Sequence, residues 1–261
     1  TEYNFGFKMK FGANAALKLS AFYRNQQDLI TLRHVIPITN DYSTQSMYMN
    51  GDFATIKGFT ATFDLRRTNR VSARLNYTYQ IAKGSGSQGG SHATIAWQES
   101  DPNFPRIIFP LDFDQRHKGT AVVDIRSIEG DGPEIGGMHP LENIGLNLMF
   151  SFHSGAPFTR IPLGDAYSSL LNFNAPPPIE ATNSSIIPWV YQLDAKFEKS
   201  FTIRSMKLIA FLRGINILNL KSYDGVFRQT GRPDTDGWLN TTSGKAILDT
   251  MGDYKDDYIN W

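Results

Sequence analysis

The histidines are the residues best suited to metal binding, and their spacing argues against that role. The sequence contains five of them, at His34, His92, His117, His139 and His153, and no cysteine. No two histidines stand at the short spacing by which one helix or loop supplies two ligands to a metal ion. The absence of cysteine also excludes disulfides and thiolate metal sites. We therefore expect no resident metal.

Other motifs for ion binding or covalent chemistry are incomplete or absent. Residues 234–237, with Asp234 and Asp236, resemble a fragment of a calcium-binding loop but lack the remaining ligands and the distal glutamate. The sequence has no nucleophile elbow, no zinc-protease motif, no phosphate-binding loop and no dinucleotide fingerprint. These observations predict a protein that is not an enzyme and that uses no cofactor.

A contact site for a ligand is the remaining possibility, and the long connecting segments hold aromatic and cationic side chains that could form one. The candidate ligand contacts are Trp97, Phe104, Arg106, Phe109, Phe113 and Trp238. Binding residues are often placed on loops that a rigid scaffold positions. The alternative is that these side chains only pack the loops together, which is the commoner role of loop aromatics.

The elements that would carry these loops are strands with one apolar and one polar face. Residues 58–80 show the pattern best, because two alternating arms flank a polar turn at Thr68 and Asn69. Side chains alternate between the two faces of a strand, so Phe59 belongs to the apolar face of the first arm and Leu75 to that of the second. Each arm has about the 9–11 residues that a tilted strand needs to cross a bilayer. We predict a β-hairpin whose apolar face meets either a protein core or lipid.

Similar segments recur along the chain and give eight predicted strands, with no long amphipathic helix between them. The strands cover residues 3–11, 17–24, the two arms of 58–80, 118–126, 144–154, 189–199 and 206–218. Phe22 interrupts the alternation of the second strand, and the last strand is too continuously apolar for its facing to be assigned from its period. Residues 25–52 are expected to extend the second strand before looping back, and a short helix is expected near residues 244–250.

The lengths of the connections alternate along the chain. They are short near residues 12–15, 66–70 and 200–205, moderate at 127–143, and long after 24, 80, 154 and 219. Short turns at one end and long loops at the other are typical of outer-membrane barrels. The alternative is a soluble antiparallel sheet with one solvated face. The net charge of +1 gives no reason to expect nucleic-acid binding.

Several phrases in the sequence resemble one family. They are residues 109–117 (FPLDFDQRH), 154–159 (SGAPFT), 216–219 (NILN), 50–59 (NGDFATIKGF) and 71–79 (VSARLNYTY). Each phrase alone is loose, but their order and spacing together resemble the C-terminal barrel of TonB-dependent outer-membrane receptors. The resemblance covers nearly the whole chain. It implies an all-β, antiparallel transmembrane barrel of about 22 strands, of which this chain would supply about eight.

The resemblance also implies a function and a set of partners. Residues 1–261 would be the C-terminal portion of the barrel, and the plug domain and N-terminal barrel half would lie outside this chain. The receptor would reside in the bacterial outer membrane, contact its lipid, and import a scarce ligand with energy from the inner-membrane TonB complex. One alternative is a non-transporting barrel that anchors surface loops or a partner lipoprotein. A weaker alternative is a soluble β-sandwich binding domain.

Overall fold

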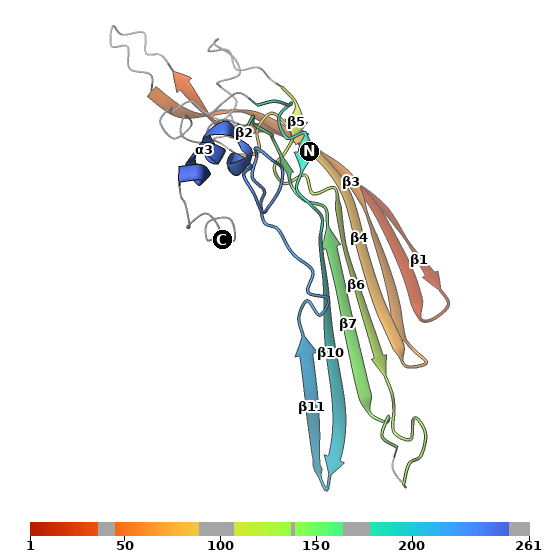
Figure 1. Ribbon diagram of the computed structural model, residues 1–261. Helices are drawn as coiled ribbons and strands as arrows, with labels where there is room; N and C mark the ends of the chain where they lie inside the picture. Colours follow the sequence, from red (N-terminus) through yellow and green to blue (C-terminus); the bar gives the residue numbers. More distant parts are fainter. Residues whose placement is uncertain (36–44, 89–106, 137–138, 164–177, 251–261) are drawn as a thin grey trace.

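The chain forms one long antiparallel sheet, in which neighbouring strands are almost always neighbours in sequence (Figure 1). The computed structural model describes residues 1–35, 45–88, 107–136, 139–163 and 178–250. The order in the sheet is β1-β2-β3-β4-β6-β7-β10-β11, and the short β5 pairs with the end of β4. The eight long strands correspond to the eight predicted from the sequence, so the all-β antiparallel fold class is confirmed.

The bounds of the elements follow the alternating segments of the sequence. The long strands are β1 (Glu2–Phe11), β2 (Ala15–Val35), β3 (Gln45–Thr68), β4 (Val71–Gly84), β6 (His117–Arg126), β7 (Ile144–His153), β10 (Val190–Ile203) and β11 (Met206–Gly214). The short elements are β5 (Phe109–Pro110), β8 (Pro157–Phe158), β9 (Ser185–Ile186), the 3-10 helix η2 (Trp238–Asn240) and the helix α3 (Thr242–Thr250). The predicted extension of the second strand and the predicted short helix are both confirmed. None of the described helices is long and apolar enough to span a membrane.

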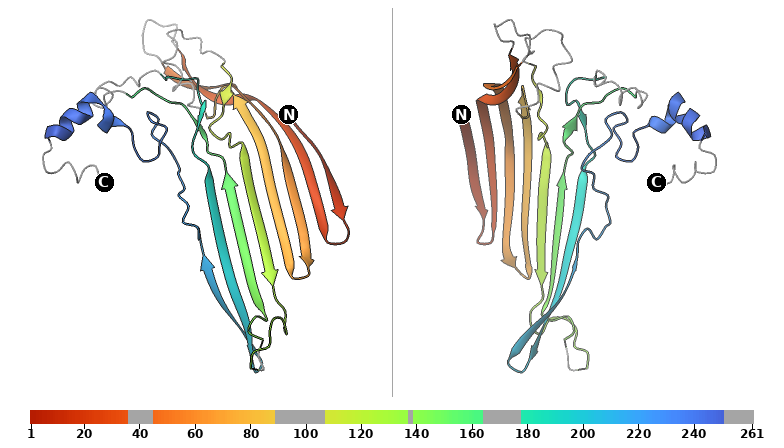
Figure 2. Two further views of the ribbon diagram at one scale, coloured as in Figure 1. Left: turned by 45° about the vertical axis from the view of Figure 1, so that its right-hand side comes forward. Right: turned by 90° about the vertical axis from the view of Figure 1, so that its left-hand side faces the viewer.

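The connections divide the sheet into two ends, as their lengths predicted (Figure 2). Short connections join β1 to β2, β3 to β4 and β10 to β11, and we call this side the turn end. Gly12, Asn69 and Arg204 adopt positive φ there, which lets the chain reverse within a few residues. The long excursions leave from the opposite side, which we call the loop end.

The register of the strands gathers the alternating side chains onto two faces. Phe63 on β3 stands opposite Leu17 on β2 and Leu75 on β4, and Leu75 stands opposite Ala121 on β6. We call this the apolar face and its opposite the polar face. The register also settles the facing of β11, because Leu212 pairs with Phe197 of the apolar face.

The apolar face has no second layer packed over it among the described residues. The buried hydrophobic side chains of that part are Ala54, Ala82, Phe109, Leu111 and Leu248. In the middle of the sheet, Leu75 and Phe197 remain 42% and 44% exposed. A soluble sheet buries its apolar face against a core, and the described part of the chain supplies no such core to this face.

Phe22, which interrupts the alternation, lies on the polar face for a steric reason. A Cβ atom built on Gly58 would approach the Phe22 ring at 2.9 Å and the Tyr79 carbonyl oxygen at 2.0 Å. The ring therefore covers a glycine on the neighbouring strand, a pairing that protects an otherwise bare stretch of backbone. Phe152 covers Gly119 in the same way on the apolar face, 2.4 Å from the built Cβ.

Candidate functional site

An aromatic girdle crosses the apolar face near the loop end. Its members are Phe59, Tyr77, Tyr79, His117, Phe150, Phe152, Trp189 and Tyr191. The ring centroids are 5.7 Å apart for Phe59 and Tyr79, 5.1 Å for Tyr79 and His117, and 5.2 Å for His117 and Trp189. Adjacent strands supply these rings from three successive rungs of the apolar face, because the strands pair in register. A band of amphipathic rings at one height is typical of a membrane–water interface.

His117 is part of this girdle rather than of a metal site. Its Nδ1 lies 2.7 Å from the hydroxyl oxygen of Tyr77, and its ring stacks on Trp189. The described part of the chain holds no group of three metal-ligating side chains. The expectation that the protein holds no resident metal stays a prediction.

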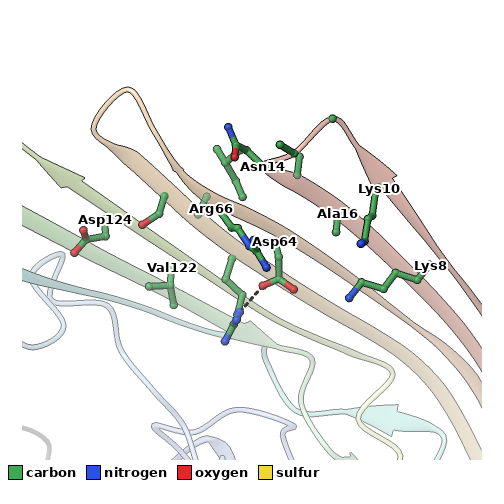
Figure 3. A pocket seen from close by; sticks show the side chains of 15 residues that line it. Lys8, Lys10, Asn14, Ala16, Asp64, Arg66, Val122 and Asp124 are labelled. Carbon is green, nitrogen blue, oxygen red and sulfur yellow. Dashed lines mark hydrogen bonds and ion pairs between the residues drawn. The ribbon is translucent and has the colours of Figure 1, made fainter.

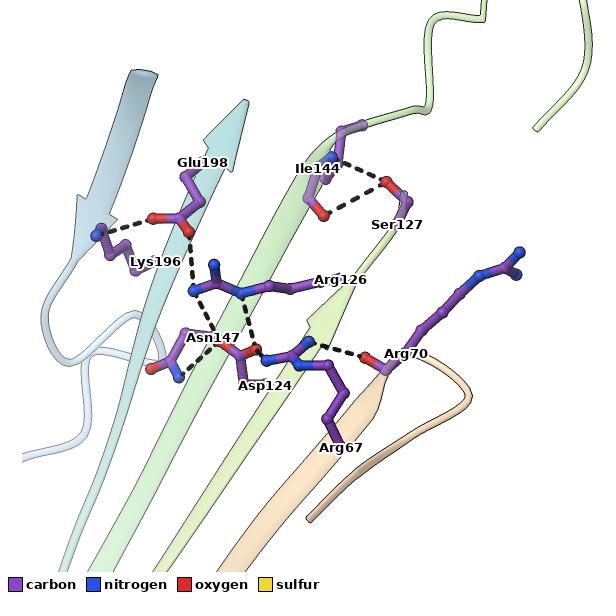
Figure 4. Close-up of polar contacts among 9 residues, drawn as sticks. All are labelled: Arg67, Arg70, Asp124, Arg126, Ser127, Ile144, Asn147, Lys196 and Glu198. Carbon is purple, nitrogen blue, oxygen red and sulfur yellow. Dashed lines mark hydrogen bonds and ion pairs between the residues drawn. The ribbon is translucent and has the colours of Figure 1, made fainter. Parts of the chain in front are cut away.

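The polar face carries a charge network close to the turn end (Figure 4). Asp124 accepts hydrogen bonds from Arg67 and from Arg126, the latter at 3.0 Å. Arg126 Nη2 also lies 3.0 Å from Glu198, which pairs in turn with Lys196 at 3.0 Å. The members come from β3, β6 and β10, so one network links strands that are far apart in the sequence. It neutralises most of the charge on this stretch of the polar face.

A shallow pocket lies on the polar face beside this network (Figure 3). Its lining includes Lys8, Lys10 and Arg66 together with the ion pair of Arg74 and Asp64, which is 2.6 Å long. Cations therefore outnumber carboxylates there. The pocket suits an acidic surface more than a neutral ligand, and it contains no arrangement of groups for covalent chemistry.

At the loop end, residues 109–117 fold back onto the polar face and form the small buried core of the chain. Phe109 and Leu111 pack against Ala54 and Ala82. The buried Asp114 fixes this position, because its Oδ1 accepts a hydrogen bond from the backbone N–H of Ala82 at 2.8 Å. The phrase FPLDFDQRH thus attaches the long excursion after β4 firmly to the sheet.

Asn183 ties a second excursion to the same place. Its Nδ2 donates to the carbonyl oxygen of Pro110 and to Oδ1 of Asp112, both at 2.8 Å. Its backbone N–H donates to Oγ1 of Thr159 at 2.8 Å, and the Thr159 carbonyl accepts from Arg228 Nε at 2.8 Å. We call these residues the loop junction: Pro110, Asp112, Thr159, Asn183 and Arg228. It joins three excursions that are separate in sequence.

Of the six candidate ligand contacts, the structure describes Phe109, Phe113 and Trp238. Trp97, Phe104 and Arg106 lie outside the described residues. Phe109 is buried, 5% exposed, whereas Phe113 is 45% exposed. Trp238 is half-buried, and its Nε1 is buried without a hydrogen-bond partner among the described residues. Phe109 thus packs locally in this structure, and ligand contact by the six residues stays a prediction.

The residues that sequence reasoning missed are the polar members of the loop junction. Asp112, together with Asp114 beside the junction, stands inside residues 109–117, which served only for the family resemblance. No local pattern in the sequence identified these aspartates or Asn183. The calcium-like fragment has local partners: Asp234 pairs with Arg232 Nη2 at 2.8 Å, and Asp236 accepts from the Trp238 N–H at 2.9 Å.

Comparison with known proteins supports the fold. No family model matches the sequence, and no curated protein matches it. Among solved structures, the chain resembles the crystal structure of the outer membrane transporter YddB from Escherichia coli, with a TM-score of 0.54 and 15% sequence identity. The match covers 84% of this chain and 28% of that one.

The sheet has the fold of an outer-membrane barrel wall. At this identity the likeness concerns the fold alone, and the chain spans less than a third of the structure that it matches. A barrel wall has lipid on one side and the lumen on the other, so one apolar and one polar face are expected without a buried protein core. Its apolar face corresponds to the lipid side of a barrel and its polar face to the lumen side.

Proposed function

We propose that this chain is the C-terminal portion of the barrel of a TonB-dependent outer-membrane receptor. The receptor captures a scarce ligand with its extracellular loops and imports it with energy from the inner-membrane TonB complex. The observation that carries the proposal is the uncovered apolar face, bordered by an aromatic girdle at the loop end and backed by a charged polar face. The order of the family-like phrases, three of which fall in or beside the loop end, supports the same receptor family.

The two edges of the sheet support the presence of further wall strands in the complete protein. In the described residues, β1 and β11 each pair with a neighbour on one side only. An unpaired backbone N–H or C=O group in hydrocarbon costs several kcal/mol. Strands of the same receptor therefore complete the barrel, and its plug domain occupies the lumen beside the polar face. The outer membrane is the proposed location.

A non-transporting barrel that holds surface loops or a partner lipoprotein is the second candidate. One observation favours this non-transporting barrel. The charged groups of the network pair with one another inside the sheet, namely Asp124, Arg126, Glu198 and Lys196. Both candidates dispense with covalent chemistry. The soluble sandwich is disfavoured, because it would leave residues such as Leu75 and Phe197 facing water.

The test uses the full-length protein in its native host. Membrane fractionation and gel migration with and without boiling check that a closed barrel lies in the outer membrane. Site-specific cross-linking to the periplasmic domain of TonB then separates the two candidates. A TonB cross-link that increases when the medium supplies the ligand supports import. A folded outer-membrane barrel that never cross-links to TonB supports the anchoring barrel instead.

A further inference from the structure

The charged side chains of the apolar face all have the same sign, and they lie near the two ends of the strands. Between the turn end and the rung that joins Thr55 to Lys83, the paired positions of this face in the described strands hold no acidic residue and no arginine. Their charged residues are Lys57, Lys83 and Lys199. The carboxylates at the paired positions of this stretch lie on the polar face. The apolar face therefore has positive charge only, and only near its two borders.

The lysines at the two borders differ in their partners. At the turn end, Lys199 Nζ donates to the carbonyl oxygens of Glu142 and Pro140. At the loop end, the exposed Lys57 and Lys83 have neither a hydrogen-bond nor an ion-pair partner among the described residues. Within the described part of the chain, two ammonium groups are therefore unpaired at the loop end of the apolar face.

These two lysines lie just beyond the aromatic girdle. Lys57 stands one rung outside Phe59 and Tyr79, which pair with each other, and Lys83 stands one rung farther on the neighbouring strand. Two residues along a strand span about 7 Å. Diagonal positions on adjacent antiparallel strands are about 7–8 Å apart, so a single anionic group can contact both flexible side chains.

We propose that Lys57 and Lys83 bind the phosphate of an anionic lipid headgroup in the leaflet at the loop end. The proposal rests on the proposed function in one respect, the membrane location of the wall. The girdle sets the depth of the membrane–water boundary, and lysines just beyond it reach headgroup level by extending their stems along the apolar surface. In this stretch no described carboxylate occupies a paired position of the apolar face, where it would compete for the ammonium groups. Lysine binds phosphate as a compact point charge, which does not require a rigid pocket.

The experiment uses the full-length receptor in detergent micelles doped with phosphatidic acid or with phosphatidylcholine. Native mass spectrometry counts the lipid molecules that each protein retains. The test variant is Lys57→Gln/Lys83→Gln, and the matched control is Lys18→Gln/Lys118→Gln, which removes the same charge from exposed positions on the polar face of the same sheet. A third variant, Lys57→Arg/Lys83→Arg, preserves the charge. Gel migration without boiling confirms that each variant forms a barrel.

We expect the unmodified receptor to retain phosphatidic acid in preference to phosphatidylcholine. Loss of each lysine should weaken that retention about fivefold, since one basic residue at an anionic surface contributes about that factor. The control and the arginine variant should behave like the unmodified receptor. Equal retention by the Lys57→Gln/Lys83→Gln variant, or an equal loss in the control, would overturn the proposal. A protein that forms no membrane barrel would instead refute the proposed function.

Discussion

Asn183→Asp is the most direct test of the loop junction. The change keeps the size of the side chain, and aspartate tolerates the positive φ of 57° at this position almost as well as asparagine does. It removes the donor group that binds both Pro110 and Asp112. It also places a second carboxylate beside Asp112 in a buried position.

The expected cost follows from the two lost hydrogen bonds. A neutral hydrogen bond contributes about 1 kcal/mol and one to a charged group about 1.5–3 kcal/mol, so the junction should lose about 2–4 kcal/mol. A loss of this size raises the population of the opened junction by about 30-fold to 1,000-fold. The wall should remain folded, because the strand ladders do not include Asn183.

Hydrogen exchange of backbone amides in the full-length receptor measures this change. Peptides that contain Leu111, Asp114 and Ala82 should lose protection, whereas peptides of the turn end should exchange as before. Asn69→Asp is the matched control, because Asn69 has a similar φ of 48° but lies exposed in a short turn. Unchanged exchange at the junction in the Asn183→Asp protein would show that other contacts hold the excursions together.

Three further predictions concern the wall and one loop. Gly58→Ala should lower the free energy of unfolding by about 1–3 kcal/mol, because the new Cβ would meet the Tyr79 carbonyl oxygen. Gly225→Ala is the control, because the space around its Cβ is open. Denaturant titration should show a lower midpoint for Gly58→Ala and little change for Gly225→Ala. Leu75→Arg on the apolar face should cost about 2–4 kcal/mol in lipid bilayers, and Asn76→Arg, one residue along on the polar face, should cost much less; equal costs would contradict the assigned faces. The Arg232 guanidinium hydrogen-bonds to Asp234 and holds the pKa of that carboxyl below its usual value. The contact is therefore complete above the usual aspartate pKa and is lost as pH falls through the lowered one. Carboxyl NMR titration should show the Asp234 midpoint rise in Arg232→Gln.

Much of the wall could be predicted from the sequence, because period-two alternation fixes which side chains share a face. Phe59 and Leu75 were assigned to the correct face of their strands before any pairing was known. The facing of β11 was not predictable in this way, since Ile209 and Phe211 place apolar side chains on the polar face. Only the pairing of Phe197 with Leu212 settles it.

The loop junction was beyond prediction from a local pattern. Asn183 binds Asp112, a residue 71 positions away, and no repeating period links the two. Phe109 illustrates the same limit for the candidate site. Its type suggested ligand contact, but its packing on Ala54 and Ala82 depends on how the excursion folds back. The side-chain type was visible in the sequence, whereas the path of the loop was not.

The sequential order of the long strands also bears on how the wall is made. Apart from the short β5, each long strand hydrogen-bonds to the long strand that precedes it in the chain. Such a sheet can grow by adding one hairpin after another, and each addition closes only the loop between neighbours, which keeps the entropic cost per step small. The salt bridges from Arg67 to Asp124 and from Arg126 to Glu198 then form only as the later strands arrive. Each bridge spans one intervening strand, so it can form only after that strand has paired on both sides.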